Sequence, residues 1–371
     1  MAEPLKNQYG PEVPVRLARE MAAVSPSFDP DAFLADALLG YDALDLMARG
    51  RHLAAVLHRH LPADYEAAVA ILLASVQAAP LPETATAMAP FFYLPHTCFV
   101  AAFGLGHFEA SMRAQHLLTQ RFTAEFSIRP FLQHHTQATL ERLAQWASDP
   151  SHHVRRLVSE GTRPRLPWGQ RLRAFQQDPT PVLALLERLK DDPELYVRRS
   201  VANNLNDIGK DHPAVLVDTA RRWLPGASPE RRWLVEHALR FAVKRGDAGA
   251  LDVLGFGARA QVAVAHARVE PAVARVGGAV AVAFELHNTQ AHAQDVLVDF
   301  CIHYMKASGQ TAPKVFKLKT ATLAPGQAVA FAKRVSLAPM TTRVHHPGTH
   351  RVEVLVNGVA LPLGSFELLA G

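Results

Sequence analysis

The spacing of apolar residues divides the chain into a helical part and a strand-forming part. From about residue 12 to residue 252, apolar side chains recur three and four positions apart, and proline or glycine interrupts the pattern at short intervals. This spacing predicts short amphipathic helices. The clearest of them are residues 32–39, 52–58, 65–73 and 182–189.

Beyond residue 254 the apolar period changes from helical to two, which is typical of half-buried strands. Sequences that favour turns, such as Pro325-Gly326 and Asn357-Gly358, separate the alternating runs. Several short strands in one stretch predict a β-sandwich of immunoglobulin-like architecture, although the Cys…Trp…Cys signature of true immunoglobulin domains is missing. The predicted strands are residues 279–287, 295–304, 315–323, 328–337 and 349–356.

A motif recurs within the helical part. Two Asp-Pro pairs, 43 residues apart, are each followed by Val-Arg-Arg, and a Ser-Pro pair begins a third copy whose Arg-Arg comes three positions earlier. This period is close to that of HEAT-type helical hairpins, which stack into a solenoid with a concave face. The three copies begin at Asp149, Asp192 and Ser228, and their arginine pairs are Arg155/Arg156, Arg198/Arg199 and Arg231/Arg232.

The length of 371 residues also favours more than one domain. We therefore expect a multidomain α + β protein, with an all-α HEAT-like repeat solenoid followed by an all-β immunoglobulin-like sandwich. The change of period near Gly255-Phe256 places the boundary between residues 1–256 and residues 257–371.

The net charge of +5 is unevenly distributed. Residues 1–112 hold 6 basic and 12 acidic side chains, residues 113–257 hold 22 and 16, and residues 258–371 hold 11 and 6. Of the 39 basic residues 30 are arginine, which suits bidentate contact with phosphate or carboxylate. A polyanionic partner is one explanation, and a coding preference for arginine and alanine is the other.

Several classes of protein are disfavoured. Residues 84–108 contain no Asp, Glu, Lys or Arg, but Pro90, Pro95 and His96 interrupt this stretch, so we expect no membrane span. The first ten residues lack the basic and apolar regions of a secretory signal, and we expect a cytoplasmic protein. Cys98 and Cys301 are too few for a disulfide framework or a C-x-x-C zinc site.

The histidine pairs invite a metal interpretation, because the sequence contains 19 His. Consecutive residues on a helix point about 100° apart and do not easily share one ion. We therefore expect no metal at His134-His135 or His152-His153.

No nucleotide-binding glycine loop, H-E-x-x-H, G-x-S-x-G or zinc-deaminase signature occurs in the sequence. The basic region instead contains three carboxylates and one tryptophan, at Glu125, Glu160, Asp207 and Trp168. Carboxylates among arginines are often only ion-pair partners, so the residues alone leave a structural role open.

Longer segments of the chain carry a family resemblance. The central segments, residues 130–136, 149–168 and 197–213, resemble the AlkC family of bacterial DNA alkylation-repair glycosylases. Residues 28–33 and 61–65 resemble it as well, and the predicted sandwich is similar to the immunoglobulin-like extension of some of its members. The resemblance covers nearly the whole chain.

The resemblance implies a DNA-3-methyladenine glycosylase type hydrolase of base excision repair. It implies hydrolysis of the N-glycosidic bond of cationic N3-alkylated bases, 3-methyladenine and 3-methylcytosine, without base flipping, metal or cofactor. An N3-alkylated base is already cationic and leaves readily, so catalysis shifts to the sugar, which develops oxocarbenium character. Preorganised carboxylates near C1′ stabilise that charge and orient the attacking water.

On the family pattern, Glu125, Glu160 and Asp207 match the acidic positions beside the lesion, and Trp168 matches an aromatic residue that packs against the sugar and lesion. We expect Asp207 and Glu125 to position water and stabilise charge, Glu160 to be a second anion or an orienting residue, and Arg156 to clamp a phosphate.

The partner implied is double-stranded DNA containing alkylated bases, bound by a monomer that associates with the bacterial nucleoid. A second module that closes around the duplex would hold an unflipped lesion exposed, since phosphate contacts alone carry no base information. In the sandwich we expect contacts from Arg343, His345, His346 and, unless they only protect an edge strand, Lys314, Lys317 and Lys319. The expected contacts of the solenoid are Arg155, Arg156, Arg198, Arg199, Arg231 and Arg232.

Two alternatives remain from the sequence. A non-catalytic HEAT-repeat adaptor that binds DNA or protein explains the repeats and the charge, but not the accompanying carboxylates and Trp168. A damage-binding relative that has lost activity is the other, although acids stand at all three family positions.

Overall fold

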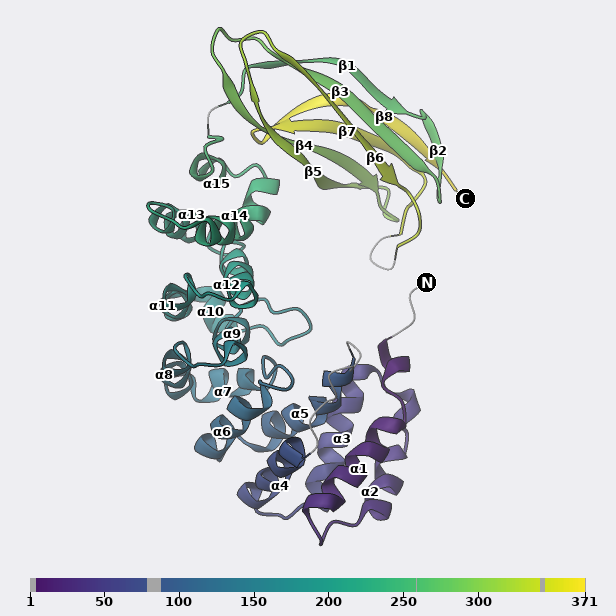
Figure 1. The fold of residues 1–371 in the computed structure, drawn as a ribbon. Coiled ribbons are helices and arrows are strands. Elements are labelled where there is room, and N and C mark those ends of the chain that lie inside the picture. The colour runs from purple at the N-terminus through teal and green to yellow at the C-terminus, as the bar shows by residue number, and fades with distance from the viewer. Residues whose placement is uncertain (1–4, 79–87, 258, 341–343, 371) are drawn as a thin grey trace. The chain divides into compact units, whose positions relative to one another are not determined.

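We describe residues 5–78, 88–257, 259–340 and 344–370 of a computed structural model of the chain (Figure 1). The helices come first and the strands last, which confirms the predicted order of an all-α part and an all-β part. The α-helices are α1 (Glu12–Val24), α2 (Pro30–Leu38), α3 (Leu46–His60), α4 (Tyr65–Ala78), α5 (Leu94–Phe103), α6 (Phe108–Leu118), α7 (Ile128–His134), α8 (Thr136–Trp146), α9 (His152–Gly161), α10 (Arg173–Gln177), α11 (Thr180–Leu189), α12 (Leu195–Ile208), α13 (Pro213–Trp223), α14 (Pro229–Lys244) and α15 (Ala248–Val253). The 3₁₀ helices are η1 (Leu5–Gln8), η2 (Tyr41–Ala43) and η3 (Ala89–Tyr93), and the strands are β1 (Val262–Glu270), β2 (Val273–Arg275), β3 (Ala279–Asn288), β4 (Gln294–Met305), β5 (Thr311–Leu323), β6 (Ala328–Ser336), β7 (Gly348–Val356) and β8 (Val359–Leu369).

The helices form where apolar spacing and capping agree. In α11, Val182, Leu185, Leu186 and Leu189 fall on one face, and all four are buried. At the start of α2, the Asp29 side chain accepts hydrogen bonds from two backbone N–H groups that the first helical turn leaves without partners. The helical segments predicted from the sequence fall on α2, α3, α4 and α11, and only residue 39 lies beyond the end of its helix.

The repeated motif marks equivalent points in two stacked helices, α9 and α12. These helices pack against each other, while α11 packs against both of them and against α8, so that the hairpins stack (Figure 1). Each helix begins two residues after its Asp-Pro pair. The third copy departs from this register, because α14 begins at Pro229 itself.

The first arginine of each regular repeat binds its own repeat. Arg155 Nη1 donates to the carbonyl oxygens of Asp149 and Pro150 at 2.8 and 3.0 Å. Arg198 Nη1 donates to the carbonyls of Asp192 and Pro193 at 2.6 and 2.8 Å. These contacts satisfy backbone oxygens in the turn that precedes each helix and explain why this arginine recurs.

The strands form two packed sheets. One has the order β1-β3-β6 and the other β2-β8-β7-β4-β5, and all pairs are antiparallel except β2 with β8. Alternate residues of β3, including Val282 and Phe284, point into the shared core with Phe300 of β4 and Phe366 of β8. The predicted immunoglobulin-like sandwich is confirmed.

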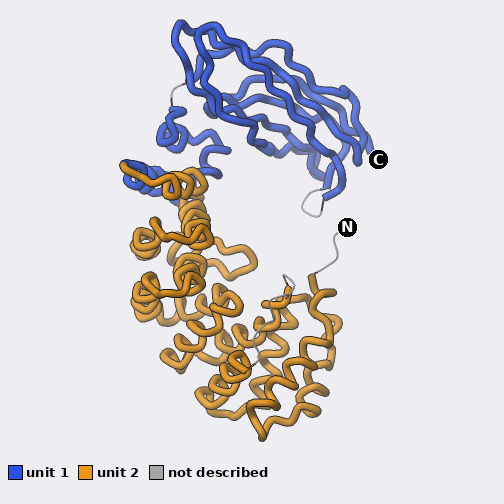
Figure 2. Tube along the Cα trace, in the orientation of Figure 1, with its two compact units in different colours: residues 1–2, 212–225, 239–371 blue, residues 3–211, 226–238 orange. Residues whose placement is uncertain are grey.

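The structure contains two compact units (Figure 2). One comprises residues 3–211 and 226–238, and the other comprises residues 212–225 and 239–371. The second unit therefore includes α13, the end of α14 and α15 together with the sandwich. The domain boundary that we predicted after residue 256 falls between α15 and β1 along the chain.

Within the second unit, helix and sandwich meet through two glycines. A Cβ on Gly358, in the turn between β7 and β8, would lie 2.7 Å from a Leu251 methyl and 3.0 Å from the Gly246 Cα atom. Both glycines have positive φ, of 78° and 72°. The two backbones approach this closely because neither residue carries a side chain.

In the part of the chain that we describe, no helix is long and apolar enough to cross a bilayer.

Candidate active site

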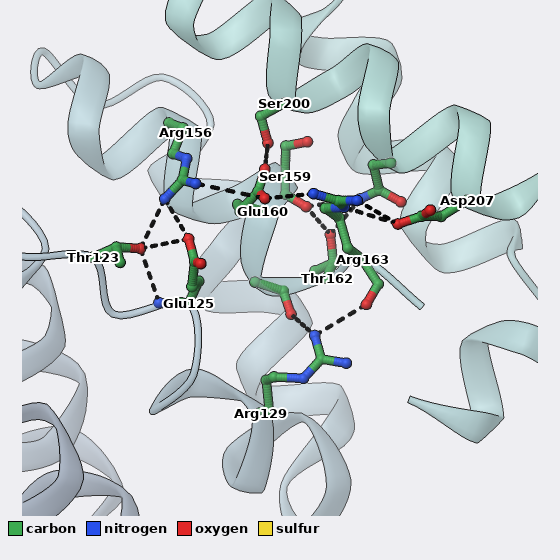
Figure 3. Close-up of polar contacts among 12 residues, drawn as sticks. Thr123, Glu125, Arg129, Arg156, Ser159, Glu160, Thr162, Arg163, Ser200 and Asp207 are labelled. Carbon is green, nitrogen blue, oxygen red and sulfur yellow. Dashed lines mark hydrogen bonds and ion pairs between the residues drawn. The ribbon is translucent and has the colours of Figure 1, made fainter. Parts of the chain in front are cut away.

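Three carboxylates and three cations form an alternating row in the helical unit, and Figure 3 shows all of them except Lys210. Glu125 lies in the loop before α7, while α9 and α12 bring in the other two acids near their C-terminal ends. The row is Glu125, Arg156, Glu160, Arg163, Asp207 and Lys210. The structure therefore brings together the three acids that the sequence suggested.

Each neighbour in the row is within ion-pair distance of the next. Arg156 lies 2.5 Å from Glu125 and 3.5 Å from Glu160. Arg163 lies 2.7 Å from Glu160 and 2.8 Å from Asp207, and Lys210 Nζ lies 2.8 Å from the other oxygen of Asp207. Three negative and three positive side chains thus alternate, and the row carries no net charge.

Neutral groups complete the contacts of two acids. Thr123 Oγ1 accepts a hydrogen bond from Arg156 and donates one to Glu125 Oε2 at 2.8 Å. Ser200 Oγ donates to Glu160 Oε2 at 2.6 Å. Such contacts hold the carboxylates in fixed orientations before any ligand arrives.

The acids differ in what they leave exposed. The side chain of Asp207 is 1% exposed and both of its oxygens accept from cations, whereas that of Glu125 is 12% exposed. Within the described ranges, Oε1 of Glu125 accepts no hydrogen bond. Glu125 is therefore the acid best placed to receive a water molecule or a substrate atom.

The carboxylates of the row favour the charged forms of Arg156 and Arg163. Burial acts to lower the pKa of Arg156, but Glu125 and Glu160 outweigh it and raise that pKa. For Arg163, burial is likewise opposed by Glu160 and Asp207, which raise its pKa.

Arg129 of α7 lies beside the row and contacts no carboxylate directly. Its side chain is 1% exposed and donates to three backbone carbonyls, those of Gly161, Arg163 and Gln170, of which Figure 3 shows the first two contacts. Burial lowers the pKa of this guanidinium to about 10.

Trp168 occupies a different place from the acids. It lies in the loop between α9 and α10, is 70% exposed and has φ of 62°, a left-handed conformation that is rare for a side chain of this size. It borders a cleft of about 330 Å³ whose lining includes Arg51, Phe126 and Arg129. Its predicted contact with a lesion stays a prediction.

The arginine pairs expected to contact DNA differ in what the structure leaves accessible. Arg155 makes a bidentate ion pair with Asp192, with distances of 2.6 and 3.1 Å, and Arg198 is buried. Arg231 is likewise paired, with Asp191 at 2.5 Å. Arg156 belongs to the row, and the two exposed members are Arg199 and Arg232.

In the sandwich, two of the residues expected to contact DNA have limited solvent exposure. His345 is buried, with its ring 5.5 Å from that of Tyr304, and His346 is half-buried. Arg343 lies outside the described residues.

The three lysines lie on β5, an edge strand, where they also suit protection against unwanted pairing. Lys317 and Lys319 are exposed, and Lys314 is half-buried.

Two cations of the row, Arg163 and Lys210, were not among the residues predicted from the sequence. Arg163 and Lys210 each follow an acid by three positions, in Glu160-Gly-Thr-Arg163 and Asp207-Ile-Gly-Lys210. Side chains three apart on a helix are neighbours, so this spacing was the available signal. Among the described residues, no group of His, Cys, Asp and Glu side chains is arranged to hold a metal ion.

Comparison with known proteins gives three similarities. The family described as "Uncharacterised protein YhaZ, C-terminal Ig-like domain" matches residues 263–370. Uncharacterized protein YhaZ of Bacillus subtilis (strain 168) is 34% identical over 355 residues, which are 95% of this chain and 96% of that protein. The solved structure of Pseudomonas fluorescens alkylpurine DNA glycosylase AlkC, bound to DNA containing an abasic site analog, is 40% identical, with a TM-score of 0.93 over 99% of this chain and 100% of that one.

Proposed function

Because the chain belongs to the AlkC family of DNA alkylation-repair glycosylases, with the C-terminal immunoglobulin-like domain, we propose that it excises cationic N3-alkylated bases from double-stranded DNA. The resemblance predicted from the sequence is thereby confirmed at the level of the family. The proposed substrates are 3-methyladenine and 3-methylcytosine, cleaved at the N-glycosidic bond without flipping the nucleotide. The observation that carries this proposal is the alternating row of acids and cations.

The chemistry of such a lesion suits the row. Its base departs as a neutral molecule, so little help from a general acid is needed, and positive charge develops on the sugar instead. Carboxylates fixed by Arg156, Arg163 and Lys210 keep their orientation as that charge appears, which avoids reorganisation at the moment of reaction.

We assign different tasks to the three acids. Glu125, with its available Oε1, positions the attacking water and faces the sugar. Asp207, with both oxygens occupied, stabilises the developing charge from within the protein, and Glu160 is the second anion between Arg156 and Arg163. Trp168 packs its exposed ring against the sugar and lesion.

DNA binding is divided between two surfaces in this proposal. Residues 1–256 carry the catalytic residues, with Arg199 and Arg232 as exposed phosphate contacts. Residues 257–371 add contacts from Lys317, Lys319 and His346. Each phosphate contact makes affinity more dependent on salt. The protein acts as a monomer in the cytoplasm, on the nucleoid, without a cofactor.

The direct test is the release of 3-methyladenine and 3-methylcytosine from methylated DNA. We expect Asp207→Asn to abolish release and Glu125→Gln to reduce it by on the order of 100-fold, the cost typical of losing one preorganised electrostatic group. DNA affinity, measured on the same duplex, should remain nearly intact for both, because neither acid attracts phosphate.

Glu20→Gln is the matched control, since Glu20 is a buried carboxylate 2.6 Å from Arg16 and outside the row. It should release bases at the normal rate. Normal release by both Asp207→Asn and Glu125→Gln would defeat the mechanism. DNA binding without any release by the unaltered chain would instead indicate a binding protein.

A further inference from the structure

We propose that Arg129 is a positioning residue for excision, which sets Glu160, Arg163 and Trp168 from one buried point. This inference rests on the proposed function, because it concerns the same site. Within the described chain, the hydrogen bonds of the Arg129 side chain go to backbone oxygens and not to the acids of the row.

Arg129 holds the C-terminal end of α9. Gly161, the last residue of this helix, directly follows Glu160, and its carbonyl accepts from Arg129 Nη1 at 3.0 Å. The last carbonyls of a helix lack partners within the helix and carry partial negative charge, so a buried guanidinium there stabilises the final turn. That turn orients the Glu160 carboxylate.

Arg129 also fixes the backbone of Arg163. The same Nη1 atom donates to the Arg163 carbonyl at 3.0 Å and so fixes the backbone from which the Arg163 side chain extends. This side chain joins Glu160 to Asp207. Displacement of the Arg163 backbone would therefore disturb two acids together.

Arg129 also binds the far end of the loop that follows α9, at Gln170. Nε of Arg129 donates to the Gln170 carbonyl at 2.7 Å, and Nη2 contacts the same oxygen. One guanidinium thus ties both ends of residues 161–170, the segment that carries Trp168 in its left-handed conformation. Since such a conformation persists only where the surroundings impose it, the tie helps to hold the ring in place.

The close packing around Gly161 supports the same role. A Cβ on Gly161 would lie 2.6 Å from the Ile128 Cγ2 atom, so the end of α9 lies directly against the start of α7. This approach brings Arg129, the residue after Ile128, within reach of the three carbonyls. Lysine offers a single ammonium in place of the planar fork, so it should reproduce only some of these hydrogen bonds.

The experiment compares Arg129→Met and Arg129→Lys with the full-length unaltered chain on methylated duplex DNA. Two quantities are measured: the single-turnover rate of 3-methyladenine release and the affinity for the duplex. We expect the Met variant to lose on the order of 100-fold in rate, as for reacting groups misplaced by about 1 Å, with affinity nearly unchanged. The Lys variant should fall between the two.

Two further readouts separate positioning from folding. The emission anisotropy of Trp168, obtained by comparing each protein with its Trp168→Phe counterpart, should fall in Arg129→Met, because the ring loses its fixed position although it is already 70% exposed. Added methylguanidinium should restore part of the release rate in Arg129→Ala. If Arg129→Met does not fold, Arg129→Lys carries the same comparison.

Arg49→Met is the matched control. Arg49 is also buried and donates to four backbone carbonyls, those of Lys6, Tyr9, Asp42 and Leu44, but it contacts nothing in residues 161–170. It should lose stability and keep its release rate.

An Arg129→Met protein with the normal rate and normal Trp168 emission anisotropy would overturn the inference, as would an equal loss of rate in Arg49→Met. If the unaltered chain releases no base, the proposed function fails, and the Trp168 emission anisotropy decides separately whether Arg129 orders the loop.

Discussion

His96 lies in the interior of the helical part, on α5, and its side chain is inaccessible to solvent. Burial, helped by the charge of Arg16, lowers the pKa of its imidazole from 6.5 to about 3. The ring therefore stays neutral in the folded protein between pH 6.5 and about 3, whereas the same imidazole takes up a proton in the unfolded chain. The free energy of unfolding should therefore depend on pH through His96.

As the pH falls below 6.5, the unfolded chain takes up a proton at His96 and the folded protein does not. The free energy of unfolding should then fall by about 1.4 kcal/mol per pH unit from this group, down to a pH of about 3. Urea unfolding between pH 7 and 4 would show the slope, and His96→Gln should make it shallower. Equal slopes in the two proteins would contradict the assignment.

At the scale of elements, the two arginines of each regular repeat have separate tasks. Arg155 bridges its own turn and Asp192 of the next repeat, and the Asp192 side chain is only 3% exposed. Arg199, the second arginine of the following pair, is exposed. The first position therefore stabilises the stack of helices, whereas the second joins the row as Arg156 and is exposed to a ligand as Arg199.

Replacement of these two residues should separate stability from binding. Arg155→Met leaves the Asp192 carboxylate buried without its partner and should cost about 3 kcal/mol of unfolding free energy. Arg199→Met should change stability by less than about 0.5 kcal/mol, while the slope of log affinity for DNA against log salt decreases by about 1. Urea unfolding and a salt titration of duplex binding measure the two effects, and a reversed order would refute the division.

Sequence patterns predicted the features that are determined by residues close together in the sequence, such as helices and strands. The helical region and the strands β3 to β7 followed from local periodicity, whereas β1, β2 and β8 were not predicted. The acids of the row followed from long motifs that carry a family resemblance. Arg129 had no such signal, because its partners are backbone carbonyls 32 to 41 positions away. The burial of His345 is likewise a result of tertiary packing against Tyr304 and leaves no mark on the local sequence.

At the scale of the whole molecule, the sandwich shares a compact unit with α13 and α15. The Gly246–Gly358 approach and the Leu251 methyl group pack the helical end of this unit against the turn between β7 and β8. Asp299 on β4 belongs to the same region: burial raises the pKa of its carboxyl, and Lys317 and Lys244 partly oppose the increase.

Gly358→Ala should weaken this packing. The new methyl group would meet the Gly246 backbone as well as Leu251, and the left-handed φ adds strain, so we expect a loss of about 2 kcal/mol. Gly326→Ala is the control, because Gly326 has a similar φ of 68° but nothing within 4 Å of the added atom. Thermal unfolding should show a larger decrease in Tm for Gly358→Ala, and equal decreases would mean that φ alone matters.

The packing of α15 and the sandwich in one compact unit affects where a chimeric protein can be joined. A chimera that joins this sandwich to another helical-repeat protein at residue 257 would leave behind Leu251 and Gly246, the surface on which the turn at Gly358 rests. A junction near residue 212 would transfer α13, α14 and α15 together with the strands. We therefore expect the chimera joined near residue 212 to be the more stable of the two.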